Sequence, residues 1–155
     1  MITIRRLVRP VLFTIVASVM MAADTAAEVT CHKINAKGVG QDLGGGSTVA
    51  QINGGGLLHG TTAGSFIITG FSGTVASIAG TVTFTTNQAT LTVTVTGTFD
   101  VSTGEFSASG PVTGATGKLA GATGSLLLSG VQDLATGVFV EEVTGDICVD
   151  LAPEG

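Results

Sequence analysis

The chain has 155 residues, of which 44% are hydrophobic, 24 are glycine and only 11% are charged. Its formal net charge is −5 at pH 7, and three of its six basic residues are arginines within the first nine positions. The sequence therefore offers no basic surface for a phosphate backbone, which excludes nucleic-acid binding and disfavours binding to anionic membranes.

Residues 1–27 have the pattern of a secretory signal peptide. A positively charged start is followed by an apolar run over residues 11–23 and then by small residues. Cleavage after Ala27 is expected, with cleavage after Ala23 as the alternative. The run is shorter than the ~20 apolar residues that cross a bilayer, which favours a cleaved signal over a retained anchor. We expect a secreted or periplasmic protein with no membrane span after cleavage.

Residues 28–155 form the mature chain, long enough for a single domain with its own core. They carry three lysines and ten carboxylates, a net charge of −7. Cys31 and Cys148 lie near its two ends, and an even cysteine count in an exported protein favours a disulfide. Two buried free thiols are the alternative. For a loop of this length the chain-entropy model gives roughly 4–5 kcal/mol of stabilisation.

The mature chain consists of β-branched segments separated by glycine-rich turns, and no helix is predicted in it. Nine strand candidates follow one another: Val29–Ala36, Thr48–Ile52, Leu57–Thr62, Ser65–Phe71, Thr74–Thr85, Ala89–Asp100, Glu105–Val112, Ser125–Val131 and Val138–Val149. Many short strands with closely spaced turn signals predict an all-β fold, either an antiparallel barrel or a β-sandwich.

Alternation is clearest in the strand predicted over Ala89–Asp100. Leu91, Val93 and Val95 fall on one face and threonines on the other, which is typical of a half-buried antiparallel strand. The regular threonines also resemble the flat arrays of ice-binding proteins, but the twist of a sheet would spoil such an array. Segment 65–69 is apolar on both faces, so we expect it to lie deeper in the protein.

Two predicted hairpin turns share one signature: aspartate, aliphatic, small, threonine, glycine, any residue and phenylalanine. The two copies run from Asp100 to Phe106 and from Asp133 to Phe139. An aspartate at the first position accepts a bond from the backbone two residues on, and the glycine supplies the positive φ that ends the turn.

A glycine-rich stretch over residues 114–124 carries the one resemblance to a known family. Its pattern resembles the Gly-Gly-Thr-Gly-x-Phe-x-Gly-Ala-x-Gly stretch of allene oxide cyclase, and dirigent proteins have a similar segment. The chain departs from it at Ala115, where the family has glycine, and at Leu119, where it has phenylalanine. The residues that carry the resemblance are Gly114, Thr116, Gly117, Gly121 and Gly124, with Leu119 at the position of the family's phenylalanine. Exported bacterial proteins of unknown role carry the same stretch.

This resemblance implies an eight-stranded closed antiparallel barrel over residues 28–155. It also implies a small apolar ligand in the lumen, a cyclase-like or stereochemical guiding activity, and a homo-oligomer. The stretch itself is expected to form a sharp corner, with Leu119 plugging one end of the barrel.

The residues available for catalysis are few, which favours a role without catalysis. His59 is a candidate for proton transfer if its ring faces the lumen, and His32 is expected to be a surface strand residue. Glu141 and Glu142 are adjacent on a strand, so one faces inward and becomes a candidate acid or base. Two histidines without other ligands at suitable spacing make no metal site, and no cofactor is expected.

Two functions remain open from the sequence. The first is a lumen that binds a small apolar molecule, with cyclase-like or dirigent-like activity. The second is a non-catalytic structural or interaction protein of the cell envelope or extracellular matrix, with its barrel filled by side chains. An apolar cavity that contains His59 or one of the two glutamates would distinguish the first from the second.

Overall fold

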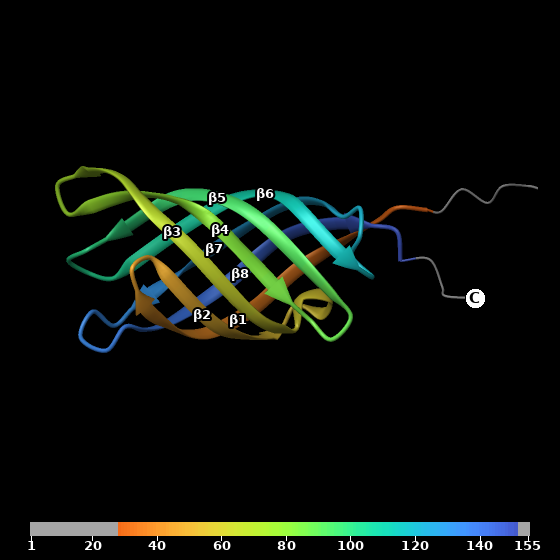
Figure 1. Ribbon diagram of the computed structural model, residues 1–155, viewed down its shortest axis with the longest axis horizontal. Coiled ribbons are helices and arrows are strands. Elements are labelled where there is room, and N and C mark those ends of the chain that lie inside the picture. The colour runs from red at the N-terminus through yellow and green to blue at the C-terminus, as the bar shows by residue number, and fades with distance from the viewer. Residues whose placement is uncertain (1–27, 152–155) are drawn as a thin grey trace, which may run out of the picture.

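The alternating segments of the chain form eight antiparallel strands in a computed structural model that describes residues 28–151 (Figure 1). Each strand pairs with the next, and the last returns to pair with the first, so the sheet is a closed barrel and not a sandwich. The strands are β1 (Thr30–Gly44), β2 (Ser47–Gly54), β3 (Gly60–Ser72), β4 (Val75–Thr85), β5 (Ala89–Asp100), β6 (Glu105–Gly117), β7 (Thr123–Gln132) and β8 (Val138–Val149). The predicted signal peptide, residues 1–27, lies outside the described residues.

Three strand predictions are corrected. β1 and β6 run to Gly44 and Gly117, beyond their predicted ends at Ala36 and Val112. The end of the candidate Leu57–Thr62 and the candidate Ser65–Phe71 belong to a single strand, β3, which turns nine predicted strands into eight. The residues before β3 form a short 3-10 helix, η1 (Gly56–Leu58), with Leu58 fully buried. It is the sole helical segment among residues 28–151, and none that could span a bilayer occurs there.

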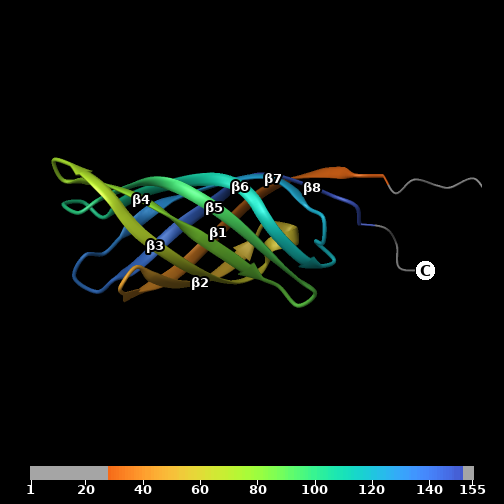
Figure 2. The same cartoon turned by 45° about the horizontal axis from the view of Figure 1, so that its top comes forward.

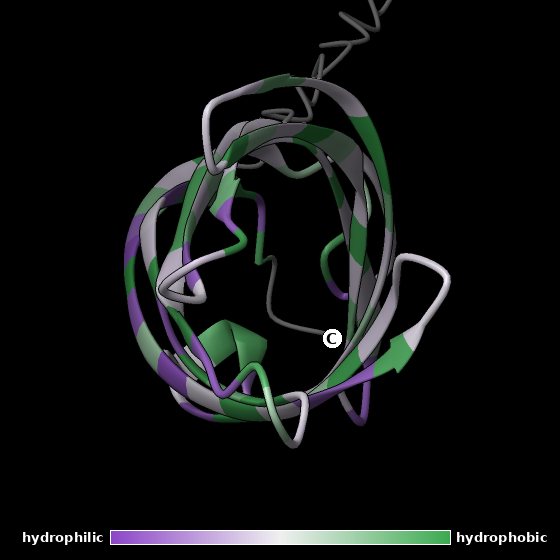
Figure 3. Cartoon of the chain, turned by 90° about the vertical axis from the view of Figure 1, so that its left-hand side faces the viewer, coloured by the Kyte–Doolittle hydropathy of each residue, from purple (hydrophilic) through white to green (hydrophobic). Residues whose placement is uncertain are grey.

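Alternation places small and aliphatic side chains inside the barrel and threonines outside it. Leu91, Val93 and Val95 are 0–1% exposed on β5. Threonines of neighbouring strands bond to one another on the outer face, as Thr83 and Thr92 do at 3.0 Å between hydroxyl oxygens. Figure 3 looks along the barrel and shows the resulting bands of apolar and polar residues around the ring.

The end of the barrel that holds η1 is closed by side chains. Leu58 and Leu119 are 0% and 2% exposed and belong to the hydrophobic core. Leu119 lies in the tight β6–β7 turn, where its amide donates to the Thr116 carbonyl at 3.3 Å. Gly117 has a φ of 62°, and a Cβ there would collide with the Gln88 carbonyl, so this corner requires glycine. The family-like stretch is therefore a corner of the closed end.

The opposite end carries the β1–β2, β3–β4, β5–β6 and β7–β8 hairpins, of which β3–β4 projects furthest (Figures 1 and 2). The predicted turn signature is confirmed here. The Asp100 carboxylate accepts the Ser102 amide at 2.8 Å, and the Asp133 carboxylate accepts the Ala135 amide at 2.8 Å. Gly104 has a φ of 79°, as the turn requires.

The expectation that segment 65–69 lies deep in the protein is wrong, because four of its five residues are exposed and only Phe66 is partly buried. Ile67 and Ile68 are 67% and 57% exposed. The β3–β4 register shifts between Ile68 and Gly70, at the projecting end of this hairpin, where no further strand covers the side chains. Ile67 and Ile68 instead form an exposed apolar surface at the open end of the barrel.

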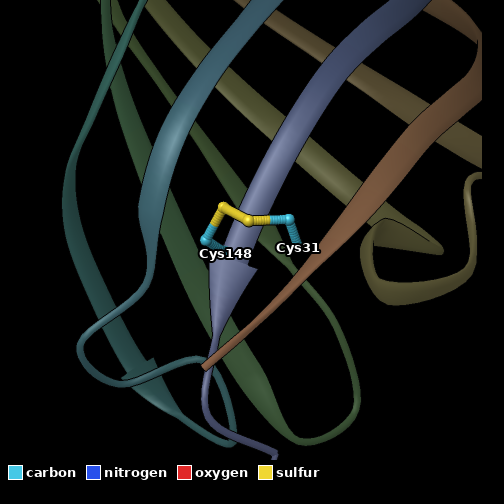
Figure 4. Close-up of a disulfide and its surroundings, with 2 residues drawn as sticks. All are labelled: Cys31 and Cys148. Carbon is cyan, nitrogen blue, oxygen red and sulfur yellow. A yellow bond between two sulfur atoms is a disulfide. The ribbon is translucent and has the colours of Figure 1, made fainter. Parts of the chain in front are cut away.

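A disulfide between Cys31 and Cys148 joins β1 to β8 near the closed end (Figure 4). The two residues are direct partners in the β1–β8 ladder, with their Cα atoms 3.9 Å apart. The pairing predicted from the cysteine count is thus present. It spans 117 residues of sequence, so it constrains most of the unfolded chain.

Replacing both cysteines, as Cys31→Ser with Cys148→Ser, should lower the free energy of unfolding by about 2–5 kcal/mol, because the unfolded chain regains its freedom. Urea denaturation monitored by circular dichroism measures the difference. Reduced wild-type protein serves as the control and should match the variant. A variant as stable as the oxidised wild type would contradict this account.

Candidate functional site

The open half of the barrel contains a cavity of about 550 Å³. This volume falls within the ~300–1,000 Å³ range of small-molecule pockets. The cavity opens among the β1–β2 and β3–β4 hairpins and is lined mainly by apolar side chains. These are Phe66, Ile67, Ile68, Ile78, Val82, Phe99, Phe106, Ala108, Leu128 and Phe139. The polar side chains that line it are Asp42, Thr48, Thr62, Gln132 and Glu141.

Inward-facing glycines of β1 leave room for the side chains of β8. A Cβ at Gly38 would lie 2.8 Å from both Cγ and Oε1 of Glu141, and a Cβ at Gly40 would collide with the Phe139 ring. Both glycines are direct ladder partners of the residues they accommodate. The β1 sequence thereby allows two large side chains of β8 to enter the lumen.

Four phenylalanines give the cavity an aromatic wall, which was not predicted from the sequence. Phe106 and Phe139 meet edge to face, with ring centroids 5.9 Å apart and planes at 90°. They are the phenylalanines that end the two copies of the hairpin signature. The signal was thus present in the sequence: each turn returns a phenylalanine to the inner face of the following strand. Phe66 and Phe99 line the same cavity.

Glu141 is the one buried charged side chain among the described residues, at 7% exposure. It lies on β8 between Phe139, which lines the cavity, and Val143, which is fully buried in the packed half. Glu141 therefore stands at the inner end of the cavity. Burial without a cationic partner raises the pKa of its carboxyl from 4.5 to about 7. Such a group can give or take a proton near neutral pH.

The neighbouring Glu142 faces the other way, as alternation requires. It is exposed, and its Oε1 lies 3.8 Å from the Lys37 Nζ on the outer surface. A surface pair of this kind contributes little to stability. Of the two adjacent glutamates, the structure places only Glu141 in the cavity.

Neither histidine reaches the cavity. His59 is exposed at the closed end, where it lines an outer recess of about 970 Å³ together with Lys118 and Asp150. His32 was expected on the surface, but it is half-buried, with an Nε2 that has no hydrogen-bond partner among the described residues. His32 lies two residues before the buried Ile34 on β1, so the two side chains point to the same, inner face, which explains the partial burial of His32.

A second carboxylate, Asp42, lies at the mouth of the cavity. Its Oδ2 accepts the Gln132 side-chain amide at 3.1 Å, and its Oδ1 accepts the Gly44 amide at 2.8 Å. Asp42 is therefore held in place, whereas no hydrogen bond or ion pair joins the Glu141 carboxylate to another described residue. Within residues 28–151 no group of three or more potential ligands is arranged to hold a metal ion.

Comparisons of the chain with protein-family models, curated proteins and solved structures find no match. The function is therefore inferred from the geometry and chemistry of the cavity.

The raised pKa of Glu141 predicts how the stability of the folded protein changes with pH. The native carboxyl binds a proton at pH values where the unfolded one does not, so stability falls as the pH rises from about 4.5 to about 7. The substitution Glu141→Gln removes this loss and should stabilise the protein at pH 8 by up to about 3 kcal/mol. Thermal denaturation across this pH range measures the effect.

Glu142, the exposed neighbour of Glu141, supplies the matched control for this experiment. Glu142→Gln makes the same change of charge one residue away and should leave the pH profile of the wild type unchanged. Equal profiles for Glu141→Gln and the wild type would contradict the account of Glu141.

Proposed function

We propose that this protein binds a small apolar molecule in its barrel lumen and acts outside the cytoplasm. The observation that carries the proposal is the cavity, which is apolar, aromatic and open at one end only. A barrel that served only as a scaffold would be filled along its whole length, as the closed half of this one is. The disulfide supports an oxidising compartment.

The resemblance of the corner at residues 114–124 to allene oxide cyclase and dirigent proteins agrees with this proposal. We infer membership of that barrel family and, with it, guidance of a reaction in the lumen. Glu141 is the cavity side chain suited to proton transfer near neutral pH, so a cyclase-like step would act through it. The corner itself lies at the closed end, so its part in such a function is architectural.

A different feature supports the alternative, a structural or interaction protein of the envelope or matrix. Val131, Val140 and Val39 are neighbours in the β7–β8–β1 ladders and are 46%, 55% and 55% exposed. An aliphatic row on the outer face is a surface that a partner or a second copy would cover. Light scattering of the purified protein tests for the homo-oligomer.

Binding in the lumen can be tested with N-phenyl-1-naphthylamine, a neutral dye that fluoresces in apolar sites. The chain has no tryptophan or tyrosine, so its own fluorescence does not interfere. The mature protein should bind the dye with micromolar affinity. The substitution Ala108→Phe fills the cavity and should weaken binding at least about tenfold while the protein stays folded, because the added ring occupies space that is now empty.

The control is Ala63→Phe, which adds the same ring at an exposed position of β3 and should leave dye binding unchanged. Circular dichroism checks that both variants are folded. Loss of about 1–3 kcal/mol of stability in Ala108→Phe, with no effect on the dye, would indicate a filled lumen and favour the structural alternative.

A further inference from the structure

We propose that the lumen takes a lipophilic amine, whose ammonium group meets Glu141 while its hydrocarbon part packs against the four phenylalanines. This inference rests on the proposed function, because it names the chemical class of the apolar ligand. Three independent features of the open half support it.

The first feature is the isolation of the Glu141 carboxylate. Its ladder partners, Gly38 on β1 and Gly130 on β7, have no side chains that could neutralise it. Asp42 is the other titratable group that lines the cavity, and it is also acidic. The nearby Lys37 and Glu142 side chains pair with each other on the outer surface. A ligand that brought its own positive charge would supply the missing partner.

The second feature is the aromatic wall. Phe66, Phe99, Phe106 and Phe139 all line the cavity that ends at Glu141. The faces of aromatic rings attract cations, and the attraction grows where water is excluded. A hydrocarbon tail that leads from Glu141 past these rings would reach the exposed Ile67 and Ile68 at the mouth.

The third feature is the charge of the mouth. Three of the four hairpins at this end carry carboxylates, the β3–β4 hairpin carries none, and no lysine, arginine or histidine lies in the turns between the paired strands there. The acidic residues are Asp42, Asp100, Glu105 and Asp133. A group of charges of one sign attracts ligands of the opposite sign and repels those of the same sign. The mouth therefore favours an amine and disfavours a fatty acid of the same length.

The test compares three ligands with the same eight-carbon chain: octylamine, octan-1-ol and octanoate. Isothermal titration calorimetry of the mature protein at pH 8, where Glu141 is ionised, measures each affinity directly. Octylamine should bind about 10- to 100-fold more tightly than octan-1-ol, as expected for a hydrogen bond to a charged group, and octanoate should bind most weakly. Octylamine should also bind more weakly at pH 5, where the Glu141 carboxyl is protonated.

Two variants separate the lumen from the acidic surface. Glu141→Gln should abolish most of the preference for octylamine over octan-1-ol, whereas Glu142→Gln, with the same change of charge outside, should preserve it. Tighter binding of octan-1-ol or octanoate than of octylamine, or an unchanged preference in Glu141→Gln, would overturn the amine inference and leave the apolar lumen standing. If none of the three ligands binds, both the inference and the proposed function fail.

Discussion

The pairing of β1 with β8 is the interaction on which the barrel and its cavity both depend. Twelve residues of each strand match in one ladder, from Thr30 with Val149 to Gln41 with Val138. This β1–β8 ladder, the seam of the barrel, removes the two edges that an open sheet would expose. The same register brings Cys31 opposite Cys148 at one end and Gly38 opposite Glu141 nearer the other. A slip of one residue would turn Glu141 outward and separate the cysteines, so fold closure, covalent linkage and site geometry are specified together.

The size of the inward side chains divides the lumen into two halves. On β8, Val143, Ile147 and Val149 are 0–1% exposed and pack with η1 and the β6–β7 corner. Towards the hairpins, glycines replace aliphatic residues on β1, and the side chains of Phe139 and Glu141 on β8 enter the space that they leave. Glu141 lies at the boundary between these halves. A carboxyl at that position is desolvated by the packed side while its oxygens remain accessible from the cavity, and this combination accounts for both its raised pKa and its availability to a ligand.

Period-two alternation predicted most of the fold, and the turn signature predicted two of the four hairpins at the open end. The bounds of β5 and β8 agree with the prediction because turn residues flank β5 on both sides and precede β8. β3 was divided in error at Ala63 and Gly64, which continue the strand. Its start was also placed too early, since Leu57 and Leu58 look like strand residues but enter a 3-10 turn. Alternation places Glu141 and Glu142 on opposite faces of β8, but it does not say which face is the interior of the barrel. That choice depends on how β8 pairs with its neighbouring strands. The aromatic wall was missed because its members come from four strands, and only closure of the barrel brings them together.

The position of the disulfide also has a consequence for motion. It ties the seam at its closed end, and at the mouth nothing covalent joins β1 to β8. Separation of these strands can therefore begin at the mouth, where Gln41 and Val138 are the last pair of the ladder. One end of the β1–β8 ladder is thus fixed by the disulfide, and the other end is held by noncovalent contacts alone. Fraying at the mouth breaks a few backbone hydrogen bonds of the ladder and leaves the rest of the fold intact.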